Sequence, residues 1–378
     1  MKKTMELYLH IPFCARKCAY CDFLSFPQGE NVQNQYVDRL IEEITTAGAG
    51  FRDTTVCSVF VGGGTPSILA SGQMRRIMDA VRENFCLESD VEISMEANPG
   101  TVTEEKLLDY RAAGINRLSF GLQSADNDEL QALGRIHTYE EFLESFRLAQ
   151  KCGFTNINVD LMSALPGQTV ESWMETLNKV IELEPEHISA YSLIVEEGTP
   201  FAELAEQNKL KLPEEEAERE MYWETHRILE RAGYEHYEIS NYALPEFACR
   251  HNIGYWERID YLGFGIGAAS LVNNQRFSNE SDIEKYLSFP MDCRREPVSL
   301  TAEEQMEEFM FLGLRLLKGI CIKTFEENFG VSLQEIYGNV IEKNVRDGLL
   351  RFCEDGEYLA LTERGIDISN YVLAQFLL

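Results

Sequence analysis

The sequence predicts an α/β fold in which an open barrel of six strand–helix units precedes a small C-terminal domain. Three observations support this prediction. Short runs of apolar and β-branched residues alternate with amphipathic stretches through the first two-thirds of the chain. Reactive or polar residues directly follow five of these runs. From residue 301 the pattern changes to helices and one pair of short strands.

The six strand candidates and their helices follow one another in regular order. The strands are expected at residues 6–11, 56–61, 91–96, 117–120, 157–161 and 187–193. The helices between them are expected at residues 33–47, 71–85, 104–113, 139–152 and 170–183. Helical crossovers make such a sheet parallel, and their right-handedness curls it toward a barrel. Six units are too few for a closed eight-stranded barrel, so we expect a partial, TIM-like (β/α)6 barrel with its chemistry at the carboxyl ends of the strands.

The chain is expected to divide into three parts. Residues 1–240 form the partial barrel, and residues 241–300 form a connecting segment with a Gly-rich, aromatic stretch. Residues 301–378 form a winged-helix-like domain, since helices there are followed by a strand pair at 349–352 and 358–361.

The net charge excludes some classes of protein. The 378 residues include 34 Lys and Arg against 63 Asp and Glu, a formal charge of −29. Nucleic-acid binding and polybasic membrane attachment both need a basic surface. No stretch approaches the roughly 20 apolar residues of a membrane span, and the N-terminal residues lack the apolar run of a secretory signal. We expect a cytoplasmic protein with no nucleic-acid partner and no integral membrane segment.

Three of the ten cysteines lie close together after the first expected strand. Cys14, Cys18 and Cys21 have the spacing C-x3-C-x2-C. Three such thiolates can ligate three irons of a [4Fe-4S] cluster. The fourth iron then stays open for the amino and carboxylate groups of S-adenosylmethionine (SAM). A structural zinc site usually has two separate ligand pairs, and the sequence has no second pair. Zinc binding and plain core cysteines are the alternatives.

The segment before the first cysteine carries a family resemblance. Residues 8–14 read Tyr-Leu-His-Ile-Pro-Phe-Cys. They resemble the start of the oxygen-independent coproporphyrinogen III oxidase family of radical-SAM proteins, and the resemblance covers nearly the whole chain. It implies a radical-SAM barrel with a [4Fe-4S] cluster on the three cysteines and SAM beside it.

The resemblance also implies SAM-binding residues near the strand ends. They are Tyr8, Tyr20, Gly63, Gly64, Thr65, Glu96, Gln123, Arg135 and Asp160. The turn Gly-Gly-Gly-Thr-Pro at 62–66 resembles the segment that meets the SAM amino group, since glycines let a ligand approach the main chain. Arg135 could pair with the SAM carboxylate, and Asp160 could accept from the ribose hydroxyls. A tight turn, structural polar residues and core aromatics are the alternatives for these positions.

Two features differ from the oxidases proper, whose cysteine pattern resembles C-x3-C-x2-C-x-C. Here the last position is Phe23, and the chain begins almost directly at the first strand. Residues 251–256, His-Asn-Ile-Gly-Tyr-Trp, match the H-N-x-x-Y-W motif of a haem-chaperone branch. That resemblance implies haem binding near His251, Tyr255 and Trp256, because imidazole ligates haem iron and aromatic rings stack on a porphyrin. The alternative is a structural histidine in an aromatic cluster.

These features leave two main functions open. One is a haem chaperone that binds haem b and transfers it to an acceptor haem protein, by resemblance a respiratory enzyme, with the cluster and SAM gating transfer or partner binding. The other is an oxygen-independent coproporphyrinogen III oxidase, which decarboxylates its substrate to protoporphyrinogen IX. Phe23 and residues 251–256 favour the chaperone over the oxidase. Radical chemistry on an unrelated substrate is a third alternative.

Overall fold

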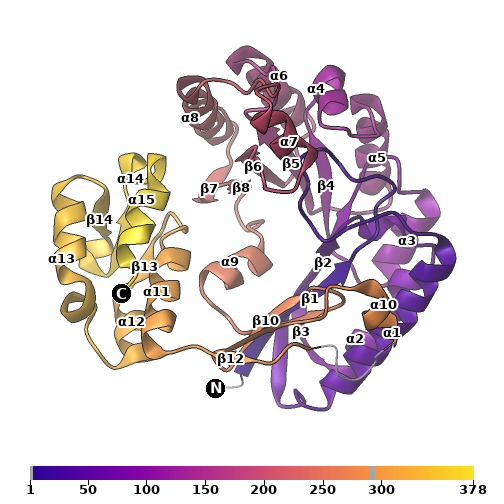
Figure 1. The fold of residues 1–378 in the computed structure, drawn as a ribbon, viewed down its shortest axis with the longest axis horizontal. Coiled ribbons are helices and arrows are strands. Elements are labelled where there is room, and N and C mark those ends of the chain that lie inside the picture. The colour runs from indigo at the N-terminus through magenta and orange to yellow at the C-terminus, as the bar shows by residue number, and fades with distance from the viewer. Residues whose placement is uncertain (1–2, 289–293) are drawn as a thin grey trace.

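The computed structural model describes residues 3–288 and 294–378. Residues 1–2 and 289–293, which fall in the expected barrel and connecting segment, lie outside the described residues. The described part contains a twelve-stranded sheet and, toward the C-terminus, a separate three-stranded sheet. Figure 1 shows the large sheet curving around an open centre, with the C-terminal domain beside the opening.

Six parallel strands form the middle of the large sheet and confirm the expected partial barrel. They are β1 (Lys3–Ile11), β2 (Thr54–Gly63), β3 (Cys86–Ala97), β4 (Arg117–Gln123), β5 (Ile157–Ser163) and β6 (His187–Ser192). The crossovers contain α1 (Glu30–Gly48), α2 (Gln73–Asn84), α3 (Glu104–Ala112), α4 (Asn127–Ala132), α5 (Tyr139–Lys151) and α6 (Val170–Ile181). These helices cover the outer face of the sheet (Figure 1).

The two faces of the parallel strands differ in chemistry because side chains alternate along a strand. In β1, Leu7 and Leu9 are fully buried in the main core, whereas Glu6, Tyr8 and His10 occupy the alternate positions. The strands of a parallel sheet usually read as continuous apolar runs. The polar inner positions therefore point to a functional interior.

Short strands extend the sheet on both sides. On one edge, β9 (Tyr261–Phe264) pairs parallel with β1 and is followed by β10 (Ala269–Val272), β11 (Gln275–Ser278) and β12 (Val298–Ser299). On the other edge, β8 (Asn241–Ala243) pairs with β6, and β7 (Glu235–Glu238) pairs with β8. The segment expected as a connection thus contributes strands to the sheet. The remaining helices of this part are α7 (Pro200–Glu206), α8 (Glu215–Arg231), α9 (Arg250–Trp256) and α10 (Ile283–Ser288).

The C-terminal residues form helices and a small sheet around their own core. The elements are α11 (Ala302–Gly313), β13 (Ile320–Cys321), α12 (Ile322–Phe329), α13 (Leu333–Arg346), β14 (Leu350–Cys353), β15 (Tyr358–Leu361), α14 (Glu363–Asp367) and α15 (Ser369–Leu373). Phe325, Tyr337 and Leu359 are buried in this core, which is separate from that of the barrel. The expected strand pair is present as β14 and β15, and β13 adds a third strand. None of the helices in the described ranges has the length and apolar character needed to cross a bilayer.

Candidate functional site

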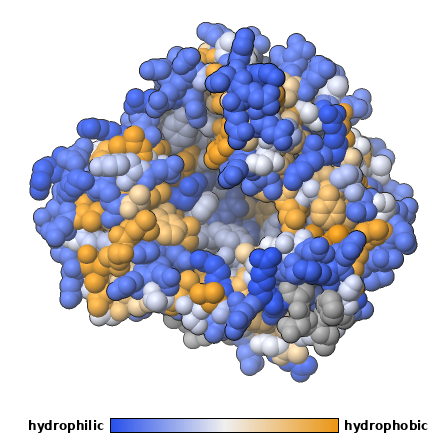
Figure 2. All heavy atoms as spheres, viewed as in Figure 1, coloured by the Kyte–Doolittle hydropathy of each residue, from blue (hydrophilic) through white to orange (hydrophobic). Residues whose placement is uncertain are grey.

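A cavity of about 360 Å³ lies inside the barrel toward the carboxyl ends of the strands. Its wall comes from β2 to β6, from the loop that carries the cysteine triad, and from Asn241 of β8 and Asn252 of α9. Figure 2 shows that this face of the molecule is hollowed between the barrel and the C-terminal domain. Parallel strands converge here, so side chains far apart in sequence share one space.

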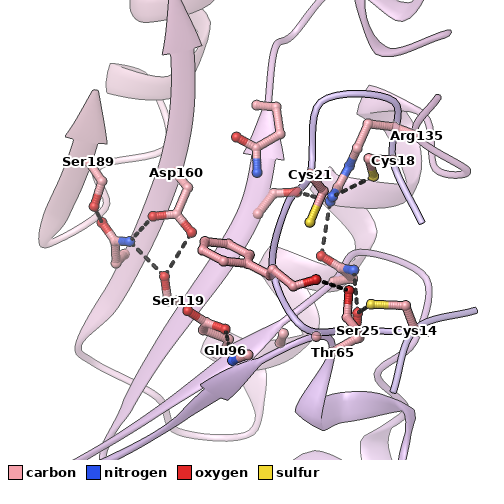
Figure 3. A pocket seen from close by; sticks show the side chains of 18 of the residues that line it. Cys14, Cys18, Cys21, Ser25, Thr65, Glu96, Ser119, Arg135, Asp160 and Ser189 are labelled. Carbon is pink, nitrogen blue, oxygen red and sulfur yellow. Dashed lines mark hydrogen bonds between the residues drawn. The ribbon is translucent and has the colours of Figure 1, made fainter. Parts of the chain in front are cut away.

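The three cysteines of the triad all line the cavity, and their thiols are free and partly exposed. The Sγ of Cys14 lies 3.5 Å from the Thr65 hydroxyl, and the Arg135 guanidinium donates to the Sγ of Cys18 over 3.7 Å (Figure 3). The described residues contain no group of three His, Cys, Asp or Glu side chains arranged around a single metal ion. The three thiolates of a cluster each bind a different iron, so this triad fits a cluster.

The turn after β2 forms a cradle beside the triad that only glycine allows. A Cβ at Gly64 would lie 2.7 Å from the Phe13 carbonyl oxygen and 3.0 Å from the Sγ of Cys14. Gly63 has φ +114°, in the region that favours glycine, and its N–H donates to the Glu96 carboxyl over 3.0 Å. Glycine at these two positions lets the turn pack directly against Phe13, Cys14 and the His10 ring, and both glycines line the cavity.

Two half-buried carboxyl groups line the cavity on the inner face of the barrel. Burial, reinforced by the nearby Asp160, raises the pKa of Glu96 to about 8. Burial also raises the pKa of Asp160, which accepts hydrogen bonds from Ser119 over 3.0 Å and from Asn158 over 2.8 Å. A bound cation would stabilise the ionised form of both groups. The positively charged sulfonium and ammonium groups of SAM have this chemistry, so the residues present fit SAM.

The remaining SAM candidates lie around the same cavity, with one exception. Arg135 donates to Asn98 over 2.9 Å and to the Gly121 carbonyl, which holds it at the cysteine end. Gln123 ends β4 with φ +75°, a strained value for a non-glycine residue. Tyr20 lines the cavity. Tyr8 is outside the lining and packs behind it, with its hydroxyl 3.0 Å from His10 Nδ1.

The H-N-x-x-Y-W segment lies in α9, which packs against Glu6 of β1 and Ser58 of β2. His251 is 2% exposed, and its Nδ1 lies 2.7 Å from the hydroxyl of Ser58, which donates to Glu6 over 2.9 Å. The Ser58 hydroxyl therefore bridges His251 Nδ1 and the Glu6 carboxyl group. Burial lowers the pKa of His251 to about 3 and raises that of Glu6 to about 8. Both groups are therefore neutral near pH 7.

The two aromatic residues of this segment are not part of the cavity lining. Tyr255 packs on the His251 ring, with centroids 5.0 Å apart, and the guanidinium of Arg315 from the C-terminal domain lies 4.4 Å from the Trp256 ring centroid. Within the segment, Asn252 lines the cavity. Haem binding by His251, Tyr255 and Trp256 stays a prediction.

Sequence reasoning missed several residues that line the cavity. Arg117 and Ser119 on β4, Asn158 on β5, and Ser189 and Tyr191 on β6 all face it. Their signal is the two-residue period of polar positions, which continues to Gly121 and Gln123 on β4 and to Asp160 on β5.

The fold and the cavity define a radical-SAM protein. The Radical SAM superfamily model matches residues 8–180, and the HemN C-terminal domain model matches residues 300–368. The structure of coproporphyrinogen III oxidase from Escherichia coli, a radical-SAM enzyme, superimposes with a TM-score of 0.86 and 26% identity, covering 100% of this chain and 90% of that one.

Relatives along the whole length define the branch. The chain is 36% identical to heme chaperone HemW of Lactococcus lactis, covering 100% of this chain and 98% of the relative. Identity is 37% to HemW of Bacillus subtilis, with 98% of each chain covered, and 35% to HemW of Escherichia coli, covering 99% and 98%. The chain therefore belongs to the HemW family.

Proposed function

We propose that the protein is a haem chaperone that binds haem b and transfers it to an acceptor haem protein, by resemblance a respiratory enzyme. The observation that carries this proposal is the similarity to heme chaperones over essentially the full length. Phe23 supports it, because the oxidase cysteine pattern has a fourth cysteine at that position. We also propose a cytoplasmic site of action, since free cysteines persist in a reducing compartment.

Different residues of the cavity would hold the cluster and SAM. Cys14, Cys18 and Cys21 would ligate the [4Fe-4S] cluster, which supplies one-electron chemistry at SAM when both are bound. The glycine cradle would leave backbone groups open to the SAM amino group. Glu96 would balance its positive charge, and Arg135, already beside Cys18, would pair with its carboxylate.

The other candidates occupy a second set of positions. Tyr20, Thr65, Gln123 and Asp160 complete the proposed SAM wall, and Tyr8 supports it from behind. The haem iron would bind near α9, where His251 Nε2 is buried without a hydrogen-bond partner among the described residues. Ligation there requires α9 to move, because the ring is packed against Phe60 with centroids 5.1 Å apart.

A second candidate function is oxygen-independent coproporphyrinogen III oxidation. The full-length superposition on the Escherichia coli oxidase favours it, since the cavity has the same fold around it. In that function the protein would decarboxylate coproporphyrinogen III to protoporphyrinogen IX.

One experiment separates the two functions. The cluster is reconstituted under anaerobic conditions, and the protein is titrated with haem and, separately, supplied with SAM, a reductant and coproporphyrinogen III. A chaperone gives a stoichiometric haem spectrum and no protoporphyrinogen. Formation of protoporphyrinogen at many turnovers per chain would overturn the proposal.

A further inference from the structure

Arg117 is a buried cation whose hydrogen-bonding groups are unused. The residue is 2% exposed, stands at the start of β4 and lines the cavity. Among residues 3–288 and 294–378, no hydrogen bond or ion pair joins its guanidinium to another protein group, and its Nε is buried without a partner. A guanidinium offers five N–H donors, and leaving them unpaired in the interior is costly.

The nearby acids are held by other groups. Glu92 accepts from the backbone N–H of Arg250 over 3.0 Å and of His251 over 3.2 Å at the start of α9. Asp160 accepts from Ser119 and Asn158. Cys249 and these carboxyl groups act on the charge of Arg117 without a hydrogen bond to it, which leaves the N–H donors along the edge of its guanidinium free. Two N–H donors along one edge of a guanidinium match the two oxygens of a carboxylate, which binds them in a bidentate manner.

The position of Arg117 sets it apart from the proposed SAM carboxylate site. Arg135 contacts the carbonyl of Gly121 and the thiol of Cys18, at the cysteine end of the cavity. Arg117 precedes Gly121 by four residues on β4, which corresponds to about 13 Å along a parallel strand. SAM has a single carboxylate, which is assigned above to Arg135. The group that pairs with Arg117 therefore belongs to a second molecule.

We propose that Arg117 binds a carboxylate of the transported ligand, one propionate of a tetrapyrrole, at the inner end of the cavity. The proposal rests on the proposed haem-binding function. A propionate projects from the edge of the macrocycle, so edge-on entry carries it into the cavity first. Asn252 lines the cavity from α9, outside the six-stranded barrel, and its amide can donate to the propionate.

The test compares haem with its dimethyl ester, in which both propionates are blocked. Cluster-reconstituted protein with SAM is titrated with each ligand in the same detergent buffer, and binding is followed by absorbance. The wild-type protein should bind haem about 10- to 100-fold more tightly than the ester, the range for hydrogen bonds to a charged group. Arg117→Met should lose most of this preference, and Arg117→Lys should keep part of it.

Arg16→Met is the matched control, because Arg16 also lines the cavity but is exposed to solvent. This variant should keep the preference for haem over the ester. Each variant is also titrated with SAM, whose affinity should not depend on residue 117.

The outcomes distinguish this subsite from the proposed function. If wild-type protein binds neither ligand, the chaperone proposal itself fails. If it binds haem and the ester equally well, the propionate site is overturned, and that result needs no variant to fold. Unchanged preference in folded Arg117→Met, or a loss of SAM affinity in place of haem affinity, would also overturn it.

Discussion

Replacement of Glu6 by glutamine tests whether the buried Glu6 carboxyl group under α9 is neutral in the folded protein. The Glu6 side chain is 1% exposed and lies under α9, so close to Gly254 that any side chain there would clash with the carboxyl group. Burial raises its pKa to about 8, and the Ser58 hydroxyl that donates to it only partly offsets this effect. Glutamine has the size of the protonated acid but cannot ionise.

The sign and size of the effect follow from the pKa. Folding raises the pKa of Glu6 from 4.5 to about 8, so the native state holds the proton more tightly than the unfolded chain. Its contribution to stability is complete below pH 4.5 and is lost as the pH rises through about 8. Between pH 6 and pH 9 this single group should lower the free energy of unfolding by about 3 kcal/mol.

The assay is urea unfolding of cluster-free wild-type and Glu6→Gln protein at pH 6, 7, 8 and 9 under reducing conditions. Subtraction of the two curves removes the titration of all other groups. The variant should gain stability over the wild type by about 3 kcal/mol across this range. Parallel pH profiles would show that Glu6 is ionised in the folded protein and would refute the reasoning.

The other predictions concern the cavity and α9. Cys18→Ala should abolish the [4Fe-4S] absorbance after reconstitution, and an intact cluster in that variant would contradict the triad assignment. Gly64→Ala should lower the iron content, and it should lower the free energy of unfolding by about 1–3 kcal/mol, because the new Cβ would clash with the Phe13 carbonyl and Cys14. Glu96→Gln should weaken SAM binding about tenfold in equilibrium dialysis, with unchanged iron content. His251→Ala should weaken haem binding while the cluster absorbance stays; unaltered haem affinity would remove it as a ligand.

The long strands of the barrel could be predicted from sequence because each combines an apolar run with a following helix. β1 to β6 each bury one face against helices, which gives a clear pattern. β9 to β12 contain two to four residues each and pair through the backbone at the sheet edge. So few residues leave no period to detect, and only the folded chain shows that β9 to β12 extend the sheet.

The candidate site could be predicted in part for a similar reason. Glu96 and Arg135 lie at or after strand ends, and the ends of adjacent parallel strands meet. Arg117 was missed because it begins its strand, far from the carboxyl ends where the site was expected, although alternation along β4 places it on the same face as Gln123. The sequence also left the environment of His251 open, since its partner Ser58 is 193 residues away and a lone histidine shows nothing of its contacts.

The charge of the whole chain and the charge of the cavity have opposite signs. The formal charge is −29, yet the cavity is lined by Arg117 and Arg135 and, where it meets solvent, by Arg16 and Lys17, against two acids, Glu96 and Asp160, with raised pKa values. Salt screens the distant surface carboxylates beyond about 8 Å, whereas charges inside a cavity act at close range. The acidic surface therefore excludes long polyanions such as nucleic acid, while the interior can still hold a small ligand with two carboxylates.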